Sequence, residues 1–434
     1  MEFSRWKNLF VVLIMTAVLT AGVSFNLQAD KTSFTDKISA VLDSQEGVLT
    51  SSVSDASPPP PPPEKLSNPP DIIKAVYITG WSAGVKSYLN YLSKLFGTTE
   101  INAVVVDIKD YSGLVSYSSG AEDVKKYNLE NRAISDIDSL VRFFHDKNIY
   151  VIGRISVFED PGYSKAKPEL AIYDKEKTAD LSQRVLWQDN NGLSWVDPAS
   201  KDVWDYNISL AKDVFYHGFD EVNFDYVRFP SDGKTENMAF PIWDKKTSMQ
   251  KIIKNFFQYL RANLPDEKLS VDLFGLTAVN TNDMGIGQVI EDAFENFDYV
   301  SPMVYPSHYA NGFIGFANPA EHPYEVIKYS LDIALNRKKV LLNQKQSLLI
   351  KNSEAEGSPA SESLAANIDV EIIKLAKLRP WLQDFNMGAD YTANMVRQEI
   401  KATQDSLGSD FKGFMLWNPS NIYTSDAVKL ETKQ

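Results

Sequence analysis

Short apolar runs alternating with amphipathic segments constrain the fold of this 434-residue chain more than any other feature. The runs predict strands at residues 74–79, 102–109, 150–156, 219–226, 269–274, 299–305, 378–383 and 412–417. The segments between them include helical patterns at residues 134–147, 203–217 and 246–263. Such alternation is typical of repeated βα units, and eight units predict an α/β fold of the (β/α)8 barrel type.

The two faces of each predicted strand differ in chemistry, because successive side chains of a strand point in opposite directions. One face is apolar and is expected to pack under the helices: Val76, Ile78, Val104, Val106, Ile108, Val222, Phe224, Val271, Leu273, Val300, Val304, Phe414 and Leu416. The other face carries polar or aromatic residues toward its C-terminal end: Asp107, Lys109, Arg154, Asn223, Asp225, Asp272, Tyr305, Gln383 and Trp417. Barrel active sites form at that end, whereas a doubly wound sheet is covered on both faces, so the pattern favours the barrel.

Asp225 and Asp272 are the candidate catalytic residues. Cleavage of a glycosidic bond needs two carboxyl groups that flank the anomeric carbon. Asp225 ends the fourth predicted strand and Asp272 lies at the equivalent height on the next one, so they would face each other across a small cleft. Asp107, across the barrel, is a third candidate carboxylate, and the residues alone leave open which carboxyl attacks and which supplies the proton. A carboxyl separation of about 5–5.5 Å would indicate retention of configuration, and about 6.5–9.5 Å inversion.

The remaining candidates are predicted to bind substrate. They are Trp81, Asp107, Lys109, Arg154, Asn223, Arg228, Tyr305, His308, Gln383 and Trp417. Sugars stack on aromatic rings. Trp81, Tyr305, Tyr309 and Trp417 end or follow predicted strands, and Trp195 lies in the long loop before the fourth. The inward charges have an alternative interpretation as helix caps or as a structural network. Arg228 is expected to orient Asp225 or to order its loop.

Composition excludes several other kinds of chemistry. The chain has no cysteine, which removes disulfides, thiolate metal sites and cysteine nucleophiles. Its four histidines show no metal-ligand spacing, so we predict no cofactor. A formal charge of −13 argues against nucleic acid as a partner. The expected partner is a polysaccharide or oligosaccharide.

The N-terminal region predicts export to the cell envelope or surface. Residues 1–29 place Arg5 and Lys7 before an apolar run, typical of a signal peptide or of a membrane anchor, and the choice stays open. Any contact with the membrane would be through this segment. Residues 30–70 are rich in Ser and Pro and predict a disordered linker. The barrel is expected over residues 71–434, with a low-complexity insertion at 352–367.

A serine hydrolase is a further alternative. Residues 80–84 (GWSAG) match the G-x-S-x-G pattern of a nucleophile elbow, with Ser82 as its serine. The pattern follows the first predicted strand, whereas the elbow of α/β-hydrolases lies in mid-sheet. We therefore regard a serine esterase as a minor possibility.

The chain also resembles a bacterial family of glycosyl hydrolase-like barrel domains. The matching segments are KAVYITGWSAG, INAVVVDIKDYSGLVSY, YVIGRISVFEDP, WVDPASKDVWDYNISLAKDVFYHGFDEVNFDYVRFPSDG, LSVDLFG, DYVSPMVYPSHY, RPWLQDF and GFMLWNPSNIY. The resemblance implies a TIM barrel related to α-amylase-like and α-galactosidase-like glycosidases, with the nucleophile at Asp225. The α-amylase-like acid/base maps onto Asp272, although that position usually holds Glu; the α-galactosidase-like acid maps onto the sixth strand, where this chain has Tyr305.

Together these features predict an exported glycoside hydrolase or transglycosidase that acts on a cell-surface or environmental glycan. The alternative is a non-catalytic glycan-binding or wall-associated barrel. In that alternative the carboxylates serve only as hydrogen-bond acceptors.

Overall fold

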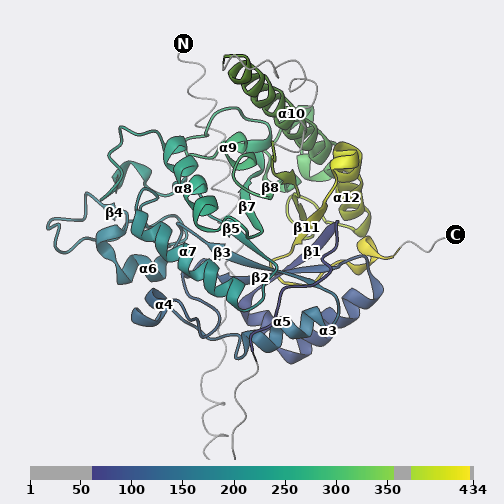
Figure 1. Ribbon diagram of the computed structural model, residues 1–434, viewed down its shortest axis with the longest axis horizontal. Coiled ribbons are helices and arrows are strands. Elements are labelled where there is room, and N and C mark those ends of the chain that lie inside the picture. Colours follow the sequence, from purple (N-terminus) through teal and green to yellow (C-terminus); the bar gives the residue numbers. More distant parts are fainter. Residues whose placement is uncertain (1–60, 356–372, 431–434) are drawn as a thin grey trace, which may run out of the picture.

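The computed structural model describes residues 61–355 and 373–430, which contain a closed parallel barrel surrounded by helices (Figure 1). The barrel strands are β1 (Ile73–Ile78), β2 (Ala103–Lys109), β3 (Tyr150–Ser156), β5 (Glu221–Asp225), β7 (Leu269–Phe274), β8 (Tyr299–Met303), β9 (Lys377–Leu378), β10 (Trp381–Gln383) and β11 (Gly413–Trp417). They run in the order β10-β11-β1-β2-β3-β5-β7-β8-β9, and β10 also pairs with β8 to close the ring. The predicted (β/α)8 barrel is confirmed.

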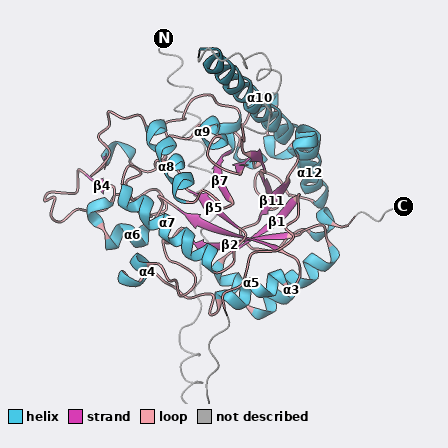
Figure 2. Cartoon of the chain, viewed as in Figure 1, coloured by secondary structure: helices cyan, strands magenta, loops and turns pink. Residues whose placement is uncertain are grey.

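Helices surround the strands on the outside of the ring (Figure 2). The α-helices are α2 (Gly80–Ala83), α3 (Lys86–Thr98), α4 (Glu122–Lys126), α5 (Ile137–His145), α6 (Pro161–Ala166), α7 (Lys201–Tyr216), α8 (Met249–Asn263), α9 (Ile290–Phe294), α10 (Pro323–Ala355) and α12 (Ala393–Leu407). Several begin where a polar side chain caps a free backbone N–H; Ser200 accepts from Val203 at the start of α7, and Ser248 accepts from Lys251 at the start of α8.

Short elements complete the loops. Strands β4 (Tyr173–Asp174) and β6 (Met238–Ala239) form a separate antiparallel pair. The 3-10 turns are Pro168–Leu170, Thr235–Asn237, Gly275–Ala278, Pro306–His308, Phe313–Gly315, Pro319–Glu321, Gly408–Asp410 and Ser425–Val428.

Two strands, β9 and β10, share the seventh position of the barrel. Pro380 separates them, because proline has no N–H with which to continue the ladder. The ring stays closed at this point, since the Arg379 N–H donates to the Val300 carbonyl and the Pro380 carbonyl accepts from Met415 N.

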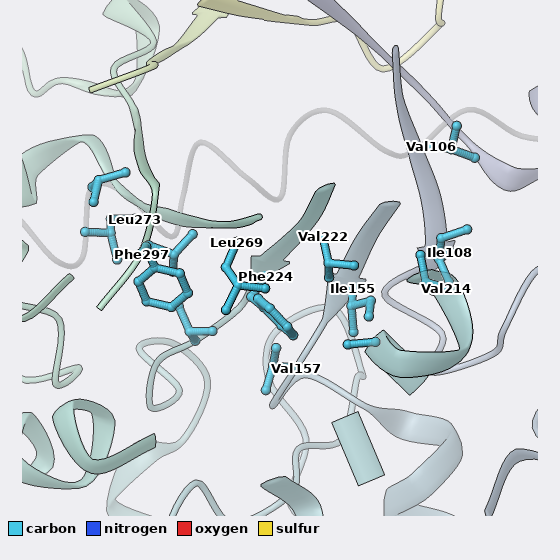
Figure 3. Packing of buried hydrophobic residues seen from close by; sticks show 14 of the residues in the cluster. Val106, Ile108, Ile155, Val157, Val214, Val222, Phe224, Leu269, Leu273 and Phe297 are labelled. Carbon is cyan, nitrogen blue, oxygen red and sulfur yellow. The ribbon is translucent and has the colours of Figure 1, made fainter. Parts of the chain in front are cut away.

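The alternation of strand faces is confirmed. All thirteen apolar residues expected under the helices belong to the hydrophobic cluster between strands and helices. Figure 3 shows part of it, where Val222 and Phe224 of β5 lie near Ile155 of β3 and Leu269 of β7. A second, smaller cluster fills the barrel itself and includes Ala75, Tyr77, Val105, Trp381 and Met415. The opposite face of the strands is therefore free to present polar groups at one end.

The N-terminal end of the barrel is closed by paired charges. Glu221 and Arg379 form a fully buried ion pair, and the Tyr150 hydroxyl donates to Glu221 at 3.3 Å. Just outside, Leu66 packs against the inner cluster, and its N–H donates to the Asp220 carboxylate at 2.6 Å. Of the predicted linker, the structure describes the last ten residues, 61–70.

Other predicted segments lie outside the described residues. These are the signal or anchor at 1–29, linker residues 30–60 and insertion residues 356–367, whereas 352–355 form the end of α10. Within residues 61–355 and 373–430, no helix has the length and apolar character needed to cross a membrane.

The Glu221–Arg379 pair yields a test of the fold. Glu221→Gln leaves the Arg379 guanidinium buried without a counter-charge, and we expect a loss of about 3–5 kcal/mol in the free energy of unfolding, measured by chemical denaturation. Replacing both residues with Met removes both charges and is expected to recover most of that loss. An unchanged free energy of unfolding in Glu221→Gln would contradict a stabilising role for the pair.

Candidate active site

Arg154 lies at the centre of the C-terminal end of the barrel. Its Nη1 donates to Asp107 on β2, while its Nη2 donates to Asp225 Oδ2 on β5 at 2.6 Å. Strand register brings the three together, because Asp107 pairs with Arg154 and Ser156 pairs with Asp225. The Tyr77 hydroxyl also donates to Asp107 at 2.5 Å. Burial raises the pKa of Asp107, and Arg154 opposes this by stabilising the charged form.

Asp225 ends β5 beside a strained residue. Its Oδ1 accepts the N–H of Tyr226 at 2.6 Å, and its Oδ2 accepts from Arg154. Tyr226 has a φ of 53°, a left-handed conformation that is uncommon for a bulky side chain. Residues held in this way cluster at functional sites. The turn fixes the carboxylate of Asp225 at the C-terminal end of the barrel, where 6% of the Asp225 surface remains exposed.

Asp272 lies on β7, the strand next to the one that ends at Asp225. Phe224 pairs with Val271, so the two aspartates follow at one level on neighbouring strands. Asp272 Oδ1 accepts from Asn223 Nδ2 at 2.8 Å and from Trp381 Nε1 at 2.7 Å. Burial and the charge of Asp225 both raise its pKa well above the ordinary value. Asp225 is therefore ion-paired, whereas burial and the charge of Asp225 disfavour the charged form of Asp272.

Aromatic side chains form one wall of this end. Tyr305 lies 5.8 Å from Trp417 and 5.2 Å from His308, measured between ring centroids. Phe385, which the sequence argument did not single out, packs against all three rings. Burial lowers the pKa of His308 to about 4, so its ring is neutral at pH 7. Three predicted binding residues are thus gathered into one cluster.

Other predicted residues lie apart from the aspartate pair. Lys109 was expected to face the barrel interior, but the register shifts between Asp107 and Lys109. Its Nζ instead contacts Asp160 at 2.6 Å and Asn207 of α7 at 2.9 Å, with no exposed surface. Gln383 is also fully buried, and its amide ties Ser307 to the backbone of Phe385. Both side chains hold loops in place.

Arg228 and Trp81 differ from the rest of the predicted set. Arg228 donates to the Phe229 carbonyl and to Ser231 and lies over the Trp195 ring, so it orders its own loop. Trp81, on α2, is 62% exposed. Trp195 and Tyr309 are buried, and their polar atoms bond to Asp189 and Ser330.

Sequence reasoning missed Glu159, in the loop after β3. The residue is 3% exposed and its Oε1 has no hydrogen-bond partner. Burial, together with the charges of Asp189 and Asp225, raises its pKa, while Arg228 acts in the opposite direction. The available signal was the acidic pair in FEDP, three residues beyond the predicted strand.

The serine of the G-x-S-x-G pattern has no histidine beside it. Ser82 Oγ donates to Asn421 at 2.7 Å and accepts from Thr79. The rings of His308 and His322 contact Ser307 and Phe316, respectively. Among the residues that the structure describes, no cluster of three or more His, Asp or Glu side chains is arranged to hold a metal ion.

A family model described as "Putative glycosyl hydrolase domain" matches residues 75–349 and 351–423. The chain belongs to this family. The match spans all strands of the barrel, including those that carry Asp107, Arg154, Asp225 and Asp272. It confirms the family resemblance seen in the sequence segments.

The chain is similar to several solved structures, and it shares its barrel fold with the first of them. The glycoside hydrolase domain of PgaB (BpsB) from Bordetella bronchiseptica is 12% identical, with a TM-score of 0.53 over 83% of this chain and 100% of that one. A hypothetical protein from Ruminiclostridium thermocellum is 37% identical over 49% of this chain and 98% of its own, with a TM-score of 0.41. The α-galactosidase TtGalA of Thermus thermophilus is 11% identical over 84% and 61%, with a TM-score of 0.45. No curated protein matches the chain.

The raised pKa of Asp272 predicts a pH dependence of stability. An acid whose pKa is raised by folding stabilises the fold below about pH 4, and this contribution is lost as pH rises toward the folded-state value. Asp272→Asn removes the proton while its amide oxygen can still accept from Asn223 and Trp381. We therefore expect the melting temperature of the variant to rise relative to wild type between pH 4 and 8.

Asp298 provides the control for this measurement. Burial alone would raise its pKa, but the Leu269 N–H and the charges of Lys268 and Arg261 lower it. Asp298→Asn should therefore lose stability relative to wild type as pH rises through the acid range. A melting-temperature difference between Asp272→Asn and wild type that stays constant with pH would contradict the protonated state of Asp272.

Proposed function

We propose that this chain is a glycosidase that hydrolyses or transfers glycosidic bonds, with Asp225 as its nucleophile and a buried carboxyl beside it, Asp272 in the sequence-based prediction, as its acid/base. The observation that carries the proposal is the pairing of these carboxyls on β5 and β7, with Asp225 bound to Arg154 and with the pKa of Asp272 raised by burial and by the charge of Asp225. Two neighbouring carboxyls with different protonation states are what acid/base and nucleophilic steps at one carbon require. Membership of the glycosyl hydrolase family supports the same reaction class.

Asp225 is suited to attack because its orientation is fixed. Two donors of Arg154 hold Oδ2, and the Tyr226 N–H holds Oδ1. A carboxylate held in this way loses little freedom when it approaches the anomeric carbon. Arg154 also compensates the charge of the nucleophile inside a buried site.

The substrate is proposed to be an oligosaccharide or polysaccharide of the cell surface or the environment. The cluster of Tyr305, Trp417, Phe385 and His308 supports this, because its rings resemble the apolar platforms on which sugars stack. The acidic character of the chain disfavours polyanionic partners. Export through the N-terminal segment would bring the enzyme to such a glycan.

Reducing-sugar release from a panel of glycans, peptidoglycan included, tests the proposal. We expect release by the full chain and a fall of about a thousandfold in Asp225→Asn, since amide oxygen is a poor nucleophile. Glu169→Gln, an exposed glutamate outside the site, serves as the matched control and should retain wild-type rates.

Two other outcomes would contradict this proposal in different ways. Release that is unchanged in Asp225→Asn would remove Asp225 from the mechanism. Binding of a glycan with no release from any member of the panel would favour the non-catalytic glycan-binding barrel.

A further inference from the structure

Glu159 is a buried acid whose Oε1 has no hydrogen-bond partner among the residues that the structure describes. Leaving a buried polar atom without a partner destabilises a protein. Such groups are rare in native structures and call for an explanation. Glu221, a buried acid at the other end of the barrel, is by contrast paired with Arg379.

Hydrogen bonds fix the backbone around Glu159, so the unpaired Oε1 is not the result of a poorly anchored loop. The Ser156 hydroxyl donates to the Glu159 carbonyl at 2.8 Å, and the residue forms an antiparallel bridge with Trp195. The next residue, Asp160, accepts from Lys109 at 2.6 Å and caps α6 through Tyr163 N at 2.7 Å. The loop thus fixes the backbone of Glu159, whereas the Oε1 of its carboxyl has no hydrogen-bond partner.

The surroundings of Glu159 belong to the proposed catalytic site. Asp225 and Arg154 are among the charges that act on its carboxyl, and Glu159 is the main cause of the raised pKa of the Tyr226 hydroxyl. The strand register is consistent with this. Ser156 of β3 pairs with Asp225 of β5, and Glu159 lies three residues after Ser156. Arg228 lies near enough to stabilise the charge that Glu159 acquires on losing a proton.

We propose that Glu159, rather than Asp272, protonates the leaving group in this reaction. The inference rests on the proposed function and differs from it in the carboxyl that supplies the proton. Asp272 is the more restrained of the two, because Asn223 and Trp381 both hold its Oδ1 and strand β7 fixes its backbone. Glu159 has a longer side chain and an unbound Oε1, so it can turn toward a glycosidic oxygen. Asp272 then binds a sugar hydroxyl.

The proton and the bonding electrons balance in two steps. In the first, an Asp225 oxygen bonds to the anomeric carbon as the glycosidic C–O bond breaks; the leaving oxygen keeps the bonding electrons and takes the Glu159 proton. In the second, the Glu159 carboxylate takes a proton from water, whose oxygen bonds to the same carbon and releases Asp225. Glu159 ends protonated, and no cofactor is consumed.

Leaving-group dependence tests this assignment. The probes are 2,4-dinitrophenyl and phenyl glycosides of the sugar that the wild-type chain releases. Dinitrophenolate departs without a proton, whereas phenolate needs one. We expect Glu159→Gln to lower kcat/KM for the phenyl glycoside on the order of a thousandfold and for the dinitrophenyl glycoside less than about tenfold. Asp225→Asn should lose both, and Glu169→Gln neither.

Contrary results separate this inference from the proposed function. If Asp272→Asn shows the leaving-group pattern and Glu159→Gln does not, Asp272 is the acid and the inference is overturned while the function stands. If the wild-type chain cleaves neither probe nor any glycan, both fail. Glu159→Gln should be at least as stable as wild type at neutral pH, because folding raises the pKa of Glu159 and an amide does not ionise.

Should Glu159→Gln unfold, Glu159→Asp gives the same information. It keeps the acid but shortens it by one methylene, so it should slow the phenyl glycoside selectively. Equal slowing of both probes by Glu159→Asp would overturn the assignment.

Discussion

The ion-paired guanidinium of Arg154 is the interaction on which the site depends. It joins β2 to β5 through Asp107 and Asp225, and strand register sets all three positions. Removing Arg154 would leave two buried carboxyls without a counter-charge, which favours their protonation or a rearrangement of the strand ends. The orientation of the Asp225 carboxylate therefore depends on one side chain of β3.

The two ends of the barrel use charge differently. At the N-terminal end, Glu221 and Arg379 neutralise each other and Leu66 covers the opening. At the C-terminal end, four buried acids (Asp107, Glu159, Asp225 and Asp272) share the cations Arg154 and Arg228. An excess of acids in a dry site can be tolerated only if some of them hold protons. The charges are thus balanced in a pair at the N-terminal end, whereas acids outnumber cations in this group at the C-terminal end.

The strands and the aspartate pair could be predicted because both follow a period of two residues. Alternation assigned Asp225 and Asp272 to one face, and register then placed them at one level. Lys109 was misplaced because the irregularity after Asp107 interrupts that period and turns its side chain toward α7. Glu159 and Phe385 lie in loops, where no periodicity links sequence position to direction. Gln383 shows a further limit, since its inward position was predicted but its loop partners were not.

The buried acids whose pKa values are raised, Asp272 and Glu159, bear on whether the barrel is catalytic. A protein that only held sugars would be more stable with neutral amides at Asp272 and Glu159, since an amide does not have to be kept from ionising at neutral pH. Amides would also supply hydrogen bonds to hydroxyls as well as carboxyls do. What an amide cannot do is release and recover a proton. Retaining two destabilising acids beside an ion-paired aspartate therefore favours chemistry over passive binding, because proton transfer is the one property that these residues add.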